Sequence, residues 1–448
     1  MDLRAFLNTL GEALLRVPQE LSPQHEMAAF LRAVEEKGLT VLFEHVAGYP
    51  NARVAGNVLV TRRHLALALS TDEAHLEATY VERKGQARPT VTLPPEEAPV
   101  KEEVIVAGGP WLPALPVLTH YERDAGPFIT AGVVFARDPE TGRRGFGIHR
   151  MMIKGERRLG IFLANPPLAT YYARAEARGE PLPVAVALGV HPALLVGAVV
   201  PDNPAGPDKL EVTGALMGTP LELVPAETVP VEVPARAEIV IEGHVLPGHR
   251  EPEGPMGENT GYYFTNTSPV MEVTAITRRR DFIYLALCPW GADVDVLFAL
   301  AGGTELRSRL QALVPEVVDV TVNPGTPGFS AVIAVRPCSP ARVRRLIGLA
   351  LHVDRRLKVV TVVNDDVDIR NPREVTWALA TRFQPDRDTV IVPGLEGYVI
   401  DPSVGRTGTT AKVGFDATRG PGPEFDKIAL PATAVAKAQA ILSSLLGS

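Results

Sequence analysis

The chain has 448 residues, of which 46% are hydrophobic and 22% charged, and its formal net charge is −7. A chain of that length is too long to fold around a single hydrophobic core, so we expect two or three domains. The composition is that of an ordinary globular enzyme. The charge balance, without a basic block, argues against nucleic acid as a main partner, and two cysteines exclude a disulfide scaffold or a metal site built on several thiolates.

The N-terminal segment 2–17 carries apolar residues at helical spacing, which predicts a helix. It lacks the basic-then-apolar layout of a signal peptide, and no apolar run in the chain reaches membrane-spanning length. We therefore expect a cytoplasmic protein that does not associate with membranes. Strand-like runs follow at 39–46 and 57–61, and a helix is expected from Arg62. The proline-rich, charged stretch 92–103 is typical of a linker or exposed loop.

Strands dominate the pattern from about 117 to 300, where residues 145–153 predict one strand and residues 168–179 predict a helix. In the last third, strands and helices alternate, which is the pattern of an α/β domain. Ser339 suits the N-cap of one of these helices. The tail 432–446 predicts a final helix that docks on this molecule or on another subunit.

Residues 250–264, REPEGPMGENTGYYF, place Glu251, Glu253 and Glu258 close together. The interspersed prolines and glycines predict a stiff loop, neither helix nor strand, that holds its side chains in fixed directions. Two neighbouring carboxyl groups resist ionising together, so one can keep a proton and act as a general acid. A solvated acidic turn is the alternative, and the aromatic residues 262–264 count against it because they offer apolar walls.

Arg150 lies in the predicted strand 145–153, where Phe146, Ile148 and Met152 share its face. A guanidinium on an apolar face needs a partner, because an unpaired buried charge is costly. One of the nearby glutamates would satisfy it through an internal salt bridge, and a substrate carboxylate would satisfy it through a bidentate contact. The residues alone leave both possibilities open.

Several segments together resemble the UbiD family of reversible decarboxylases, which use prenylated FMN. They are FITAGVVFARDPETG (128–142), GIHRMMI (147–153), LEVTGALMGTPLELVP (210–225), EIVIEGHVLPG (238–248), PEGPMGENTGYY (252–263), VVNDDVDIRNPREVTWALATRFQPDRD (362–388) and AKVGFDAT (411–418). The resemblance implies a catalytic set of Arg150, Glu253 and Glu258, with Glu251 outside the motif as an exposed residue.

The resemblance also implies an architecture of the α/β class. An N-terminal α/β segment (1–114) would precede a central flavin-binding split β-barrel (115–305) and a C-terminal α/β domain (306–448). The last domain would make most contacts of a homo-oligomer, a dimer or a hexamer. Its terminal helix is the one predicted from the tail.

The implied activity is a non-oxidative decarboxylation of an aromatic, heteroaromatic or α,β-unsaturated carboxylic acid. In enzymes of this kind the cofactor, supplied by a flavin prenyltransferase, bonds to the acid and the adduct then loses carbon dioxide. Arg150 would orient the carboxylate while paired with Glu253, and Glu258 would protonate the carbon that remains.

The chain departs from the family at the cofactor phosphate. There the family uses an Asn, a His and a Glu to bind a divalent metal, typically manganese, with potassium nearby. The matching positions are Gly145, the segment with Asn165 and Pro166, and Lys209. Glycine and proline offer no side-chain ligand and lysine repels a cation, so manganese and potassium are not expected.

Lys209 would instead pair directly with the phosphate, together with Lys412, which matches a family lysine at the same phosphate. The alternative is a decayed site in which Lys209 is a surface residue. The full set of residues expected at the cofactor is Gly145, Ile148, His149, Arg150, Asn165, Pro166, Lys209 and Lys412. Of these, His149 is expected to face away from Arg150 and to pack or form a hydrogen bond.

Two other functions remain open from the sequence. The chain is either a non-catalytic UbiD-like subunit of a larger carboxylase or decarboxylase complex, or an enzyme that binds another phosphorylated ligand through its two lysines. Cys288, in an apolar run, is expected to be a core residue rather than a nucleophile.

Overall fold

The computed structural model describes residues 1–106, 111–404, 408–418 and 427–446. It divides into two compact units, and helix α8 (Ala292–Leu313) contains residues of both. The first unit comprises Met1–Leu306, Val322–Ser330 and Glu396–Thr410, and the second comprises Arg307–Thr321, Ala331–Leu395 and Ala411–Ser448. The candidate catalytic residues all belong to the first unit.

A four-stranded sheet of the first unit has the order β1-β2-β3-β16. Its strands are β1 (Leu14–Leu21), β2 (Thr40–Val46), β3 (Arg53–Gly56) and β16 (Ile283–Leu285). The accompanying helices are α1 (Leu3–Thr9), α2 (Glu26–Glu35), α3 (Arg62–Ala68) and α4 (Leu76–Lys84). Because β16 comes from far along the chain, this sheet joins the N-terminal residues to the central ones, and the predicted boundary at 114/115 stays a prediction.

Two N-terminal predictions were too long or misplaced. The helix predicted over 2–17 ends at Thr9, and Leu14 and Leu15 instead pair in parallel with Thr40 and Val41 of β2. Pairing with a distant strand thus outweighs the helical spacing of these leucines. The strand predicted at 57–61 lies earlier, in β3, and its own residues form the turn before α3.

The largest sheet in the described residues has nine strands, eight of them in the order β6-β9-β10-β15-β14-β11-β7-β8, with β5 paired to β15. Their bounds are β5 (Glu103–Ile105), β6 (Phe128–Ile129), β7 (Val133–Arg137), β8 (Arg144–Ile148), β9 (Met151–Ile153), β10 (Arg158–Ile161), β11 (Leu182–Leu188), β14 (Ile239–Gly257) and β15 (Tyr263–Arg278). No ladder joins the end strands β6 and β8 among these residues, so the predicted barrel is not closed.

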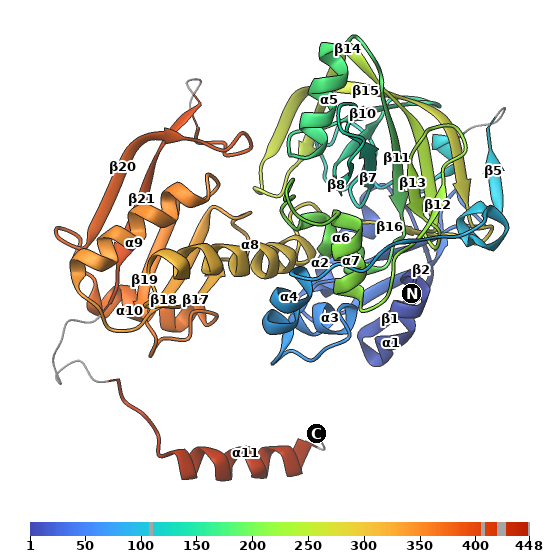
Figure 1. The fold of residues 1–448 in the computed structure, drawn as a ribbon. Coiled ribbons are helices and arrows are strands. Elements are labelled where there is room, and N and C mark those ends of the chain that lie inside the picture. Colours follow the sequence, from blue (N-terminus) through green and yellow to red (C-terminus); the bar gives the residue numbers. More distant parts are fainter. Residues whose placement is uncertain (107–110, 405–407, 419–426, 447–448) are drawn as a thin grey trace. The chain divides into compact units, whose positions relative to one another are not determined.

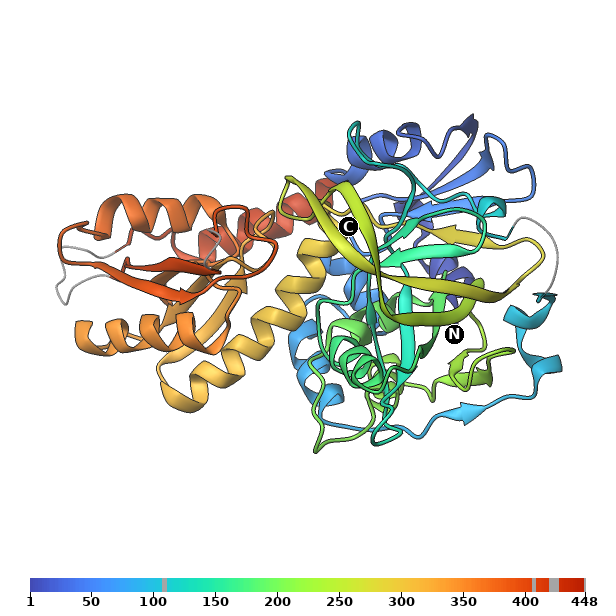
Figure 2. The ribbon, with the colours of Figure 1, turned by 90° about the horizontal axis from the view of Figure 1, so that it is seen from above.

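The long antiparallel pair β14–β15 is the most extended feature of this sheet (Figure 1; in yellow-green, Figure 2). Helix α5 (Leu168–Ala177) confirms the helix predicted over 168–179, and it packs against β11 and β14. Helices α6 (Pro192–Val199) and α7 (Lys209–Met217) pack on each other and on β8. A small sheet of β4 (Val91–Thr92), β12 (Glu222–Pro225) and β13 (Glu232–Pro234) completes the unit.

The single strand predicted over 145–153 is two strands in the structure. β8 pairs with β7, whereas β9 pairs with β6 and β10, and the chain leaves the ladder at His149 and Arg150 between them. Arg150 therefore stands at the junction of two strands rather than on one continuous strand face.

The second unit contains a five-stranded sheet of order β17-β18-β19-β21-β20, in agreement with the alternating pattern of the last third. Its elements are β17 (Val317–Val322), β18 (Ser330–Val335), α9 (Pro340–Val353), β19 (Val359–Asn364), α10 (Pro372–Arg382), β20 (Thr389–Glu396), β21 (Thr409–Asp416) and α11 (Ala432–Leu446). Ser339 occupies the N-cap of α9 as predicted, but its side chain makes no capping hydrogen bond. Within the described ranges, none of the helices is both long enough and apolar enough to cross a bilayer.

Candidate active site

The acidic segment is part of a strand as far as Gly257, so the prediction of a stiff loop that is neither helix nor strand was wrong. Residues up to Gly257 belong to β14 and pair with β15, with a register shift between Glu253 and Met256 that accommodates the extra residues. Gly254 sits in this bulge with a φ of +95°, and a Cβ there would lie 2.6 Å from the carbonyl oxygen of Phe264. Only glycine fits such a position, so the bulge fixes where Glu253 points.

Arg150 joins the two predicted catalytic glutamates. Its Nε lies 2.9 Å from Glu253 Oε1, and its Nη1 pairs with Glu258 Oε2. The side chains of Arg150, Glu253 and Glu258 are 9%, 0% and 12% exposed, so the cluster is nearly dry and its electrostatic attractions are strong. One cation between two acids leaves a net negative charge before any ligand binds.

Two aromatic rings and a serine further support this cluster, and of these only Phe264 belonged to the apolar walls predicted from the sequence. The guanidinium lies over the rings of Phe162 and Phe264, at 4.1 and 5.0 Å from their centroids. The hydroxyl of buried Ser268 donates a hydrogen bond to Glu253 Oε2. Glu253 therefore has a partner on each oxygen. Alternation along β15 would place Phe264 and Ser268 on one face, but only the register with β14 shows which residue they support.

The aromatic residues after the acids differ from their expected role. Tyr262 is 63% exposed, and the Tyr263 hydroxyl accepts a hydrogen bond from the backbone N–H of Arg123, so only Phe264 contacts the guanidinium. Glu251 is half-exposed and pairs with Arg158 at 2.9 Å on the outer surface. It takes no part in the Arg150 cluster.

Lys209 is buried, which rules out its interpretation as a surface residue. Its side chain is the first of α7, and its Nζ donates to the carbonyl oxygens of Phe146 (3.0 Å) and Ala198 (2.7 Å). Burial lowers the pKa of this ammonium from 10.5 to about 7, against the weaker opposing attraction of Asp202. No carboxylate of the described residues lies within ion-pair distance of it.

The position of the family asparagine has no room for a side chain. A Cβ on Gly145 would lie 2.7 Å from Cε2 of Tyr171 and 2.8 Å from Cγ of Pro167. Lys209 reaches the carbonyl of the neighbouring residue, Phe146, and places a positive charge there. The residues present therefore do not fit a divalent metal, and no group of three or more His, Cys, Asp or Glu side chains elsewhere in the described residues could hold one.

The remaining expected cofactor residues fall into different surroundings. Ile148 is half-buried against the core, and His149, as expected, is buried with Nδ1 2.9 Å from the carbonyl oxygen of Phe162. Desolvation lowers the pKa of His149 to about 4, so the ring is neutral and Nδ1 carries the donated proton. Asn165 and Pro166 are exposed, and Asn165 accepts a hydrogen bond from the Tyr398 hydroxyl.

Lys412 belongs to the second unit. Its buried Nζ donates to the carbonyl oxygens of Leu351 (3.2 Å) and Arg355 (2.9 Å) at the end of α9. A cation at the C-terminal end of a helix is favourable on its own. Its contact with a cofactor phosphate stays a prediction.

Three family models match successive parts of the chain. They describe the N-terminal domain (residues 7–84), the Rift-related domain (92–292) and the C-terminal domain (296–417) of 3-octaprenyl-4-hydroxybenzoate carboxy-lyase. The three models have the same order along the chain as the N-terminal, central and C-terminal parts described above.

Relatives of known function and structure match over almost the whole chain. The chain is 36% identical to the anhydromevalonate phosphate decarboxylase of Methanothermobacter thermautotrophicus over 93% of this chain and 96% of that protein. It is 31% identical to the phenolic acid decarboxylase of Bacillus subtilis over 94% and 93%. An evolved dimeric form of the UbiD-class enzyme HmfF from Pelotomaculum thermopropionicum, solved with prFMN, matches with a TM-score of 0.87 and 37% identity, covering 97% and 98% of the two chains.

Proposed function

This chain belongs to the UbiD family of decarboxylases, and from that premise we propose that it removes carbon dioxide non-oxidatively from an aromatic, heteroaromatic or α,β-unsaturated carboxylic acid with prenylated FMN. The observation that carries the proposal is the position of Arg150 between Glu253 and Glu258 in a nearly dry cluster. The likeness to a phenolic acid decarboxylase supports the aromatic part of the substrate class.

The three residues have separable tasks. Glu253, fully buried and held by Ser268, fixes the Nε edge of Arg150. The Nη1 side is taken by Glu258 in the ligand-free protein, so an incoming carboxylate competes with Glu258 for it. Displaced from Arg150 and next to a second carboxylate, Glu258 is favoured in its protonated form. When carbon dioxide departs, that proton passes to the carbon it leaves, and partly exposed Glu258 takes another from solvent.

The modified flavin, when bound, supplies the reactive ring that accepts electrons from the breaking carbon–carbon bond. Lys209 is proposed to hold its phosphate. Two of the three ammonium protons are engaged by carbonyls, and the third is available for a phosphate oxygen. The ammonium also lies at the N-terminal end of α7, where its charge opposes the helix dipole unless an anion is present. We propose that the ammonium replaces the metal ion in this role.

The assembly and location complete the proposal. A homo-oligomer is supported by the dimeric relative and by α11, whose side chains Val435, Ile441, Leu442 and Leu445 are exposed. A flavin prenyltransferase is proposed as the cofactor source and the cytoplasm as the location. The location is proposed from the composition, which includes only two cysteines.

The test is to purify the protein after co-expression with a flavin prenyltransferase. Native mass spectrometry should show the mass of prenylated FMN, elemental analysis no stoichiometric manganese, and a panel of aromatic and unsaturated acids should include one that releases carbon dioxide. A protein without bound flavin would favour the non-catalytic subunit, and a different bound mass would favour another phosphorylated ligand. Bound flavin with stoichiometric manganese would overturn the role given to Lys209.

A further inference from the structure

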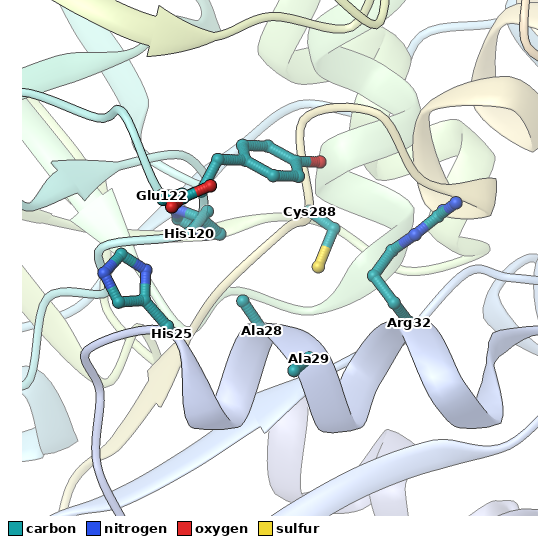
Figure 3. A pocket seen from close by; sticks show the side chains of 8 residues that line it. His25, Ala28, Ala29, Arg32, His120, Glu122 and Cys288 are labelled. Carbon is teal, nitrogen blue, oxygen red and sulfur yellow. The ribbon is translucent and has the colours of Figure 1, made fainter.

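A cavity of about 420 Å³ lies in the first unit, apart from Arg150 and the two glutamates. Its wall comes from three separate segments: α2 with the residue before it, the stretch around Tyr121, and the residue Cys288 after β16. Figure 3 shows His25 and His120 toward one end, Arg32 toward the other, and Cys288 between them. This volume is in the range of small-molecule sites.

The two histidines are held in place by the backbone around them. Residue 24 forms a parallel bridge with Thr119, and the backbone N–H of His25 donates to the Thr119 carbonyl oxygen. His25 holds a φ of +70°, an uncommon conformation for this residue type. His120 is 5% exposed, and in the described protein neither of its ring nitrogens, nor Nδ1 of His25, has a hydrogen-bond partner. Buried polar atoms without a hydrogen-bond partner destabilise the folded protein unless a ligand or a water molecule bonds to them.

The charge of the wall disfavours an anion. Arg32 is neutralised by Glu35 at 2.6 Å and also donates to the carbonyl oxygen of Trp290. Burial lowers the pKa of His120 to about 4 and raises that of the Cys288 thiol to about 12, so both are uncharged at neutral pH. Glu122, which also lines the cavity, adds a carboxylate that repels acids.

The walls are too apolar to hold water throughout. Ala28, Ala29, Tyr121 and Cys288 are half of the eight residues that line the cavity. A trapped water needs two to four polar partners. The cavity has room for more water molecules than the two imidazoles could hydrogen-bond. A compound with an apolar body and one group that both donates and accepts a hydrogen bond would fit the apolar walls and give the buried imidazole nitrogens a partner.

We propose that this cavity binds a neutral aromatic compound of one or two rings that carries a hydroxyl group. Such compounds are phenols, and a phenol is what remains when a hydroxybenzoic acid loses its carboxylate. The idea that the ligand is a product of the reaction therefore rests on the proposed function. The existence of the binding site does not depend on that function. Two of the lining residues are linked to the acidic strand by hydrogen bonds through Asp124. Asp124 accepts hydrogen bonds from the backbone N–H groups of His120 and Tyr121 and from that of Gly257, next to Glu258.

The test is a ¹⁹F NMR titration with 4-fluorophenol, with 4-fluorotoluene as the matched compound without a hydroxyl. The wild-type protein should bind 4-fluorophenol saturably. His120→Phe, which keeps a ring but removes both nitrogens, should weaken that binding about tenfold and leave 4-fluorotoluene unchanged, as expected for one lost hydrogen bond.

Ala29 provides a second variant that does not depend on His120. Ala29 is exposed and lines the cavity, so Ala29→Leu should block both compounds, whereas Ala33→Leu, one turn along α2 at an exposed position outside the wall, should block neither. Equal binding to the wild type, His120→Phe and Ala29→Leu would overturn the proposal, as would water alone in the cavity. Loss of the binding when the flavin is loaded would assign the cavity to the cofactor. Carbon dioxide release is measured separately, so failure of the proposed function would leave this result standing.

Discussion

Arg150 and Lys209 are both buried cations, and they differ in their partners. Arg150 has one carboxylate at Nε and a second at Nη1. Among the described residues, the Lys209 ammonium contacts two carbonyl oxygens and the face of the Phe146 ring, and burial lowers its pKa to about 7. On the function proposed above, a ligand of the first site must displace Glu258 from Arg150, whereas an anion can bind at the second site without displacing a carboxylate.

The largest effect is expected from a mutation in the Arg150 cluster. Glu258→Gln should lower the rate of carbon dioxide release about a thousandfold, in the range typical of a lost general acid, because glutamine cannot donate the proton. Flavin content, read from the absorbance spectrum, should be unchanged. Glu251→Gln is the matched control on the same strand, because Glu251 pairs on the outer surface. Normal turnover by Glu258→Gln would remove its assignment as the acid.

Mutation of Lys209 should change flavin affinity and protein stability in opposite directions. Lys209→Met should reduce flavin affinity about thirtyfold, as expected for one lost charge-assisted hydrogen bond. The same change should raise the free energy of unfolding of the flavin-free protein by a few kcal/mol. The reason is that it replaces a buried, poorly solvated cation by an uncharged side chain of similar size. Urea unfolding and flavin titration measure the two effects. Lower stability together with unchanged affinity would show that the ammonium serves the fold alone.

The pH dependence sharpens the contrast between the two sites. Between about pH 7 and 10.5 the unfolded chain keeps the Lys209 proton that the folded, flavin-free protein lacks, so this residue makes stability rise with pH across that window. Flavin affinity should fall over the same window, by up to tenfold per pH unit above 7, because the phosphate binds the protonated amine. Equilibrium dialysis from pH 6.5 to 9 tests this, and Lys209→Met should show a flat profile in that range.

The smallest expected effect concerns the support of Glu253. Ser268→Ala leaves one oxygen of a fully buried carboxylate without its donor, so turnover should fall about tenfold. Ser268→Thr keeps the hydroxyl and should restore turnover. Equal losses in Ser268→Ala and Ser268→Thr would show that the hydroxyl does not act through Glu253.

The sequence predicted those features that depend on local pattern or on a long motif. It gave the helix at 168–179, the terminal helix at 432–446, the alternation of the last third and the meeting of Arg150 with Glu253 and Glu258. The family resemblance supplied the last of these, because residues 103 positions apart cannot be paired from periodicity.

Features that depend on pairing between distant strands were missed. Residues 250–257 looked incapable of strand pairing, yet the register shift in β14 tolerates their prolines and glycines. Leu14 and Leu15 kept helical spacing but joined β2. Ser268 and Phe162 acquire their roles only through the register of β15 and the path of the chain after β10. No local signal marks either residue as part of the site.

The crowding around Gly145 has a consequence for anyone who wishes to engineer this part of the molecule. The ring of Tyr171 and the side chain of Pro167 already occupy the space that a larger side chain at position 145 would need. The amine of Lys209 donates a hydrogen bond to the carbonyl oxygen of the next residue, Phe146. Substituting asparagine for Gly145 alone would therefore push these neighbours apart without creating a metal site, and a designed metal site would need simultaneous changes at Gly145, at Lys209 and in the side chains packed around them.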